Sequence, residues 1–298
     1  MTHDSDRLTR FLLDRAGVRG VRVHLRDSWA QIRARGDYPL AVAELLGEAT
    51  AAAALFTGHA KIDGRLSVQL RGQGRLRTLF AECTAAGTLR GIAQLAEGDD
   101  SPVSRDLREL GPGAMLAITI ESRGAPGREP MRYQGVVALE SDSLAAAFEQ
   151  YFRQSEQLPT RLLLAADEHQ AAGLMLQKLP GDEGDEDGWN RASVLFDTLQ
   201  PGELLEWPAD TLLARLFQED APRLLGDRPL RFACSCSRER VAAMLESLGP
   251  EEARAAVIDG AARIRCEFCG QDYQFSGDEV EALFHRPDDG IRTPGTLQ

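Results

Sequence analysis

The sequence predicts an α+β fold, and three observations support this. Apolar and polar residues alternate in several stretches between residues 19 and 179, which is typical of half-buried strands. These strands come in runs with helices interspersed, so a regular βαβ repeat is excluded. The character of the chain changes after Pro180, where a run of acids begins. We therefore predict a first domain at residues 1–180, a linker at residues 181–231 and a small domain at residues 232–298.

The elements of the first domain follow from local patterns. Glycines at 72, 74 and 87 interrupt the alternating stretch 65–95, which predicts a meander of strands. Ser143 begins a helix that Pro159 stops. The remaining expected strands are residues 19–25, 114–122, 131–141, 161–166 and 172–179, the second and third joined by a Gly/Pro-rich turn at 123–130. The apolar stretch 40–56 contains Glu44 and Glu48, and its Ala and Leu content predicts a buried helix and not a membrane span.

The linker is expected to start as an exposed acidic loop and to continue as short helices. Five of the six residues 182–187 are acidic and cannot form a packed core. Pro201 and Pro208 divide residues 191–220 into short amphipathic helices. Their apolar residues must pack on the larger domain or on a partner: Leu195, Phe196, Leu204, Leu205, Trp207, Leu212, Leu213, Leu216 and Phe217.

The last domain combines helix signals with two cysteine pairs. Ser237 is the expected N-cap of a helix over residues 238–248, which Gly249 and Pro250 end. A second helix is expected at residues 251–258, followed by two strands joined by a cysteine-containing knuckle within residues 262–275. Ser276 and Glu279 then form a capping box for a last helix.

Charge and patterning exclude several classes of function. The formal net charge of -12 opposes capture by nucleic acid or by an anionic membrane. Lys61 and Lys178 are the only lysines, and neither lies in a P-loop motif, so no ATP site is expected. The first residues interleave charged and apolar side chains and do not resemble a signal peptide. We expect a cytoplasmic protein, in which clustered cysteines bind metal or act as redox centres.

Four of the five cysteines form a pattern typical of a Zn²⁺ site. Cys234 and Cys236 make a C-x-C pair, and after 29 further residues Cys266 and Cys269 make a C-x-x-C pair. Zn²⁺ prefers four tetrahedral ligands and accepts thiolates. Four cysteine ligands leave no open coordination position, so metal-dependent catalysis is not expected, and we do not expect an enzyme. Zn²⁺ with four thiolates carries a net charge of -2. The flanking arginines could stabilise this charge: Arg231, Arg238, Arg240, Arg263 and Arg265.

The spacing leaves open whether the site only stabilises the domain or also acts as a switch. A disulfide across C-x-C closes a small, strained ring and is easily reduced again. Structural zinc contributes on the order of 10–16 kcal/mol in small peptides, whereas whole domains are stable by only about 5–15 kcal/mol. A unit of roughly 65 residues is marginal without such support. Oxidation with loss of zinc should therefore unfold it and expose the apolar linker faces, which would bind other apolar surfaces.

Several motifs resemble those of the redox-regulated chaperone family heat shock protein 33. They are CSCSRERV at 234–241, CEFCGQDYQF at 266–275, YFRQSEQLPT at 151–160, AAGLMLQKLP at 171–180 and LRG at 89–91. The resemblance covers essentially the whole chain.

The resemblance implies an ATP-independent holdase that acts in the oxidative stress response. It implies one Zn²⁺ per chain, bound in the reduced, inactive state by Cys234, Cys236, Cys266 and Cys269. On oxidation Cys234 would bond Cys236, Cys266 would bond Cys269, and a metastable linker would unfold. The active form would be a homodimer that binds unfolding or partly folded proteins and prevents their aggregation.

Two other classes of function remain as alternatives. A zinc-stabilised nucleic-acid-binding module would use the arginines near the cysteines, but the surrounding acids weaken it. A thiol-disulfide oxidoreductase would use C-x-x-C, but expects a thioredoxin-like βαβ context. Cys83 lies in a strand-like stretch and is expected to be a packed small hydrophobe. His285 is close enough in sequence to reach the site, but a fifth ligand is not needed.

Overall fold

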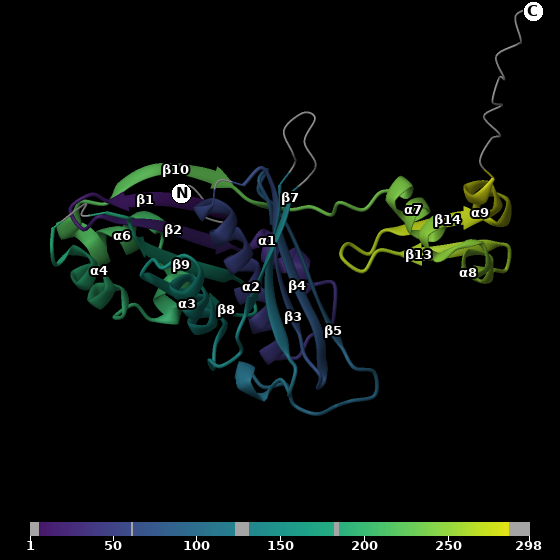
Figure 1. Ribbon diagram of the computed structural model, residues 1–298, viewed down its shortest axis with the longest axis horizontal. Helices are drawn as coiled ribbons and strands as arrows, with labels where there is room; N and C mark the ends of the chain where they lie inside the picture. The colour runs from purple at the N-terminus through teal and green to yellow at the C-terminus, as the bar shows by residue number, and fades with distance from the viewer. Residues whose placement is uncertain (1–5, 61, 123–130, 182–184, 286–298) are drawn as a thin grey trace, which may run out of the picture. The chain divides into compact units, whose positions relative to one another are not determined.

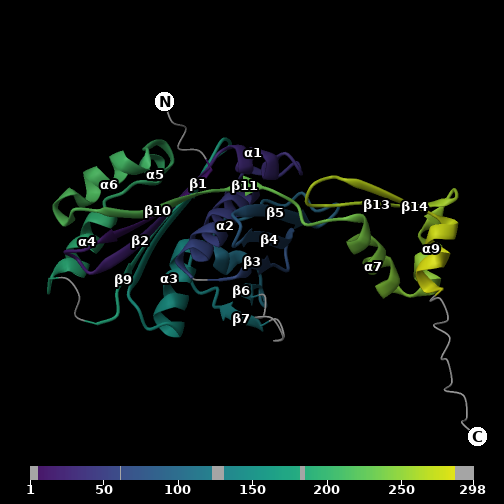
Figure 2. The ribbon, with the colours of Figure 1, turned by 90° about the horizontal axis from the view of Figure 1, so that it is seen from above.

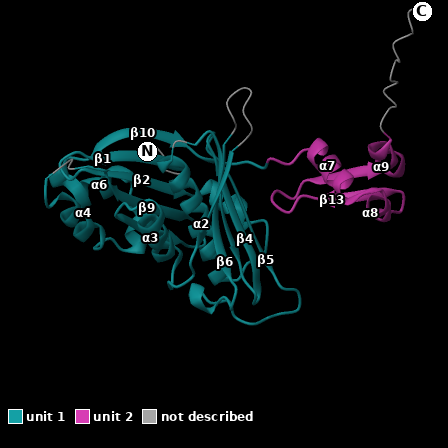
Figure 3. Cartoon of the chain, in the orientation of Figure 1, with its two compact units in different colours: residues 1–234 teal, residues 235–298 magenta. Residues whose placement is uncertain are grey.

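In the computed structural model, which describes residues 6–60, 62–122, 131–181 and 185–285, the chain divides into two units, residues 1–234 and 235–298 (Figure 3). The apolar cores of the first unit and of the second are separate clusters. The expected turn at 123–130 and the first acids of the expected linker loop, 182–184, lie outside the described residues.

Two sheets form the frame of the first unit. The five-stranded sheet has the order β10-β1-β2-β9-β8 and is antiparallel throughout. Its strands are β1 (Arg7–Leu13), β2 (Val18–Leu25), β8 (Thr160–Ala166), β9 (Ala171–Lys178) and β10 (Arg223–Pro229). The six-stranded sheet has the order β11-β5-β4-β3-β6-β7. Its strands are β3 (Gly64–Arg71), β4 (Leu76–Thr84), β5 (Thr88–Leu95), β6 (Met115–Ser122), β7 (Met131–Val137) and β11 (Arg231–Phe232). The predicted meander over 65–95 is confirmed as β3, β4 and β5.

Helix α2 (Leu40–His59) lies between the two sheets (Figures 1 and 2). It contacts β2, β8 and β9 of one sheet and β3, β4 and β5 of the other, which explains why its apolar residues are not confined to one face. Within the described residues it is the one helix long and apolar enough to span a membrane, and 83% of that 18-residue window is buried. The expectation of a buried core helix is confirmed.

Two further helices lie beside the sheets. Helix α1 (Asp27–Arg33) was not predicted; Trp29 and Ile32 anchor it in the core around α2. Helix α3 (Leu144–Ser155) begins after Ser143, whose hydroxyl accepts a hydrogen bond from the Ala146 amide, as expected of an N-cap.

Short helices cover the face of the five-stranded sheet that points away from α2. They are α4 (Gly188–Phe196), α5 (Pro201–Glu206) and α6 (Ala209–Phe217), followed by a 3-10 turn at Gln218–Asp220. All nine apolar linker residues predicted from sequence join this second core or pack against it. The sheet contributes Phe11, Leu13, Val18, Leu174 and Leu176. The linker helices therefore pack on the larger unit, which is one of the two alternatives expected from the sequence.

As far as residue 285, the second unit has three helices that pack against a small antiparallel sheet. The helices are α7 (Arg238–Leu248), α8 (Pro250–Ala255) and α9 (Gly277–Phe284), and the strands are β12 (Val257–Ile258), β13 (Ala261–Arg265) and β14 (Asp272–Ser276). The Ser237 cap and the Ser276/Glu279 capping box are confirmed.

The prediction of a helix over residues 251–258 is wrong at its C-terminal end. Val257 and Ile258 form strand β12, because Asp259 and Gly260 take positive φ angles of 51° and 82° and turn the chain back into β13. β-branched residues suit a strand at this position.

Candidate metal and redox site

A long-range strand pairing positions the first cysteine pair. Strand β11 lies at the edge of the six-stranded sheet and runs parallel to β5, with Phe232 opposite Leu89. The Ala233 amide continues this ladder by donating to the Leu89 carbonyl at 3.0 Å. The Arg35 guanidinium lies 5.4 Å from the centre of the Phe232 ring. Cys234, which follows directly, is thereby held beside β5.

The second pair lies on the turn between β13 and β14. The Cys266 amide donates to the Gln271 carbonyl at 2.9 Å, and the Gly270 amide donates to the Cys266 carbonyl at 2.7 Å. Gly270 has a φ of 72°, as expected for a glycine in a knuckle. Cys266 and Cys269 therefore sit on one tight turn between antiparallel strands, which is not the strand-to-helix context of a thioredoxin-like motif.

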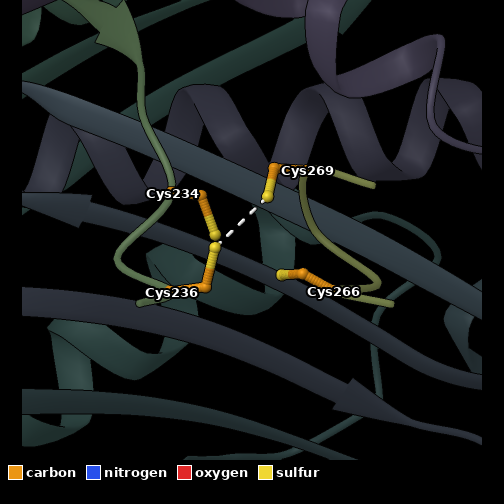
Figure 4. Close-up of side chains that lie close together, drawn as sticks. All are labelled: Cys234, Cys236, Cys266 and Cys269. Carbon is orange, nitrogen blue, oxygen red and sulfur yellow. Dashed lines mark hydrogen bonds between the residues drawn. The ribbon is translucent and has the colours of Figure 1, made fainter. Parts of the chain in front are cut away.

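The four sulfurs of the two pairs point toward one another (Figure 4). The Sγ atoms of Cys234, Cys236, Cys266 and Cys269 all lie within 4.8 Å of one another, and those of Cys236 and Cys269 are 3.3 Å apart. None of the four cysteines is in a disulfide, and all four are half-buried. A tetrahedral zinc site with Zn–S bonds of about 2.3 Å separates its sulfurs by about 3.8 Å, so this donor set fits a tetrathiolate metal centre.

A neighbouring tyrosine hydroxyl donates to one of the four sulfurs. The Tyr273 hydroxyl donates to the Cys236 Sγ at 3.1 Å. This hydrogen bond, together with burial and the negative charge of the cysteines, raises the pKa of Tyr273 to about 12. Hydrogen bonds of this kind orient metal ligands and stabilise their charge.

Two of the five arginines expected to stabilise the site, Arg238 and Arg240, have other partners. Arg238 donates to Glu279 and to the Gln274 carbonyl, both at 2.7 Å, and Arg240 donates to the Ser235 carbonyl at 2.9 Å.

Sequence reasoning missed Arg90 on β5, whose side chain hydrogen-bonds Glu82 and the sulfur of Cys234. Burial opposes the charge of Arg90, but its bonds to Glu82 and the charges of Glu82 and Cys234 raise its pKa. The available signal was the LRG stretch at 89–91, which carried part of the resemblance.

The remaining candidates lie apart from the cluster. Cys83 is fully buried in the core around α2, and burial raises the pKa of its thiol to about 11, so the expectation of a packed small hydrophobe is confirmed. The His285 ring pairs with the Glu281 carbonyl at 2.8 Å and is not in the metal-binding group found among the described residues.

Comparison with known proteins identifies close relatives. The sequence model of the Hsp33 protein family matches residues 6–276. A 33 kDa chaperonin of Ectopseudomonas mendocina is 44% identical over 92% of this chain and 94% of its own length, and one of Azotobacter vinelandii is 43% identical over 94% and 95%. The crystal structure of a 33 kDa chaperonin from Thermotoga maritima has the same fold, with a TM-score of 0.73 at 21% identity over 93% of this chain and 97% of the other.

Proposed function

The chain belongs to the Hsp33 protein family, and we propose that it is a cytoplasmic, redox-regulated chaperone that holds unfolding proteins without ATP and without catalysing a reaction. The convergence of four thiols within 4.8 Å carries this proposal, because these groups can bind a metal when reduced and form disulfides when oxidised.

In the reduced state Cys234, Cys236, Cys266 and Cys269 hold one Zn²⁺ per chain. The metal supplies binding energy that keeps the small second unit folded. Among the described residues of that unit, the core cluster has six buried apolar side chains, which is little for a domain of its size: Val241, Leu245, Ala253, Ala262, Phe275 and Val280. The donated bond from Tyr273 and the turn around Gly270 preorganise the thiolates.

Oxidation removes the ligands. We assign the disulfides to Cys234 with Cys236 and to Cys266 with Cys269, following the family resemblance. For each pair, two thiols lose two electrons and two protons to one hydrogen peroxide, which is reduced to two waters. A sulfur in a disulfide is no longer a thiolate and binds zinc poorly.

Unfolding of the second unit then allows the helical segment α4–α6 to detach from the five-stranded sheet. This segment follows residue 187 and leads through β10 and β11 into Cys234, so it is continuous with the oxidised site. Its helices have six to nine residues and are not stable alone. When they detach, their apolar side chains and the sheet face around Phe11 and Leu174 become available to unfolding proteins.

An oxidant titration of the purified protein tests this proposal. Zinc content, free thiols and suppression of aggregation of a thermally unfolding client are measured on the same samples. We expect one zinc per chain and no suppression in the reduced protein, then zinc release and suppression together as peroxide or hypochlorite is added.

Equal suppression in both redox states would exclude the switch. Mass spectrometry of peptides from the oxidised protein tests the disulfide assignment, and a crossed pairing such as Cys236 with Cys269 would contradict it.

A further inference from the structure

A row of alternating charges crosses the six-stranded sheet on the face away from α2. From β5 to β7 its members are Arg90, Glu82, Arg65, Glu121 and Arg132. The cation–carboxylate distances are 2.8 Å for Arg90 to Glu82, 3.7 Å for Arg65 to Glu82, 2.6 Å for Arg65 to Glu121 and 3.9 Å for Arg132 to Glu121. The row is therefore continuous over the five strands from β5 to β7.

The Arg90 end of this row is much more buried than the Arg132 end. The side chains of Arg90 and Glu82 are 13% and 6% exposed, whereas that of Arg132 is 65% exposed. Arg90 Nε and Nη2 donate to the two oxygens of Glu82 at 2.8 and 3.2 Å, and the guanidinium lies 5.9 Å from the Phe80 ring centre. A buried ion pair recovers its desolvation cost poorly, so stability of the sheet alone is a weak reason for it.

Arg90 has a second neighbour that explains its position. The bond from the Ala233 amide to the Leu89 carbonyl places Cys234 next to Arg90, whose guanidinium hydrogen-bonds the cysteine sulfur. Glu82 fixes the orientation of the guanidinium, and strand β11 fixes the position of the sulfur. One positive charge is thus held against one of the four thiols of the metal site.

We propose that Arg90, oriented by Glu82, is a positioning residue of the redox site that stabilises the metal-bound thiolate of Cys234 and so sets how readily zinc is lost on oxidation. The inference rests on the proposed function, because it requires a metal-bound reduced state. Four thiolates around Zn²⁺ carry a net charge of -2, which a guanidinium at hydrogen-bond distance offsets. A Cys234 in a disulfide carries no charge, so the contact favours the reduced state alone.

The test compares two full-length, reduced proteins that differ only at Arg90. Glu82→Gln keeps the arginine, and Glu82→Gln with Arg90→Gln removes it without leaving a buried carboxylate unpaired. Zinc affinity is measured by competition with a chromogenic chelator, and zinc release is followed at a fixed peroxide concentration. We expect the double variant to bind zinc about 10- to 100-fold more weakly than Glu82→Gln, as for other groups that hydrogen-bond metal ligands, and to release it faster.

Two further variants separate charge from packing. Arg90→Lys in the Glu82→Gln protein should recover most of the affinity, because it keeps the positive charge. Arg132→Gln, at the exposed end of the same row, should bind zinc as the wild type does. If the Lys variant binds as weakly as the Gln variant, Arg90 acts by packing and the proposal is wrong.

The outcome also distinguishes this inference from the proposed function. If wild type binds zinc and is activated by oxidant, but the two Arg90 forms agree in affinity within twofold, only the role of Arg90 is refuted. If the reduced wild-type protein binds no zinc, both the proposed metal switch and the proposed role of Arg90 are refuted.

Discussion

Two buried titratable side chains on helix α2 have pKa values far from their ordinary range, in opposite directions. Burial raises the pKa of Glu48 to about 7, although the neighbouring Arg105 guanidinium opposes the shift. Burial and the charge of Arg19 lower the pKa of His59 to about 4, so its ring is neutral at pH 7 and pairs with Arg19 at 2.9 Å. Both shifts arise because α2 lies between two sheets, where even its polar residues lose contact with water.

Glu48→Gln should change how stability depends on pH. Between pH 4.5 and about 7 the Glu48 carboxyl keeps its proton in the folded chain and loses it in the unfolded chain. The contribution of Glu48 to stability is therefore complete below pH 4.5 and is lost as the pH rises through about 7. Between about pH 5 and pH 8 the free energy of unfolding of the wild type should fall by roughly 3 kcal/mol relative to the variant. Urea unfolding of the reduced protein at both pH values measures this.

His59 is present in both proteins and contributes in the opposite sense, since its stabilisation is lost as pH falls from 6.5 toward 4. Comparing the variant with the wild type cancels that contribution. Glu44→Gln is the matched control, because Glu44 pairs with the same Arg105 but is less buried. A parallel pH profile for Glu48→Gln and wild type would contradict the assignment.

At the scale of elements, the segment α4–α6 is held by its apolar faces and by a few polar contacts. The Arg191 guanidinium pairs with the carboxylate of Asp220, which has no exposed surface, and with Asp185 at 3.0 Å. The buried Arg22 of β2 donates to the Trp207 carbonyl at 2.5 Å. Because each helix is short, loss of one contact should loosen the whole segment.

Arg191→Gln should detach this segment more easily. It leaves the Asp220 carboxylate buried without its ion-pair partner, which costs roughly 3 kcal/mol. We expect faster amide exchange and faster proteolysis at residues 188–220 in the reduced, zinc-bound protein, and activation at lower oxidant concentration. Mass spectrometry of hydrogen exchange provides the measurement.

Arg223→Gln is the control for that substitution. Its partner Asp14 is half-exposed, as is Arg223 itself, so the pair is screened by water and its loss should change exchange little. Equal protection of residues 188–220 in wild type and in Arg191→Gln would show that the apolar faces alone hold the segment.

At the scale of the whole molecule, we propose that oxidation produces a homodimer. The face of the five-stranded sheet under α4–α6 is apolar, and a newly exposed apolar face can pair with its own copy around a twofold axis. Light scattering should give the monomer mass of 32.6 kDa for the reduced protein and about twice this mass after oxidation, reversed by a thiol reductant.

Cys83→Ala should dimerise in the same way, because Cys83 is buried and lies outside the four-cysteine cluster. A monomer after complete oxidation and zinc release would refute the dimer without affecting the redox switch itself.

The sequence by itself determined the features that depend on neighbours a few residues away. Ser143, Ser237 and Ser276 cap their helices, and Gly270 closes the turn that carries Cys266 and Cys269, because each effect is a local hydrogen bond or a local φ angle. The spacing of the cysteines likewise predicted a four-sulfur cluster, whose sulfurs the structure brings together.

Only the tertiary structure decided which distant segments meet. Strands β1, β10 and β11 carry weak local signals and are defined by pairing with strands elsewhere in the chain. The burial of Glu48, the sheet face that α4–α6 cover, and the contact of Arg90 with Cys234 all follow from that pairing. Sequence patterns record the propensity of a residue and its near neighbours, whereas desolvation and long-range contacts depend on the topology of the sheets.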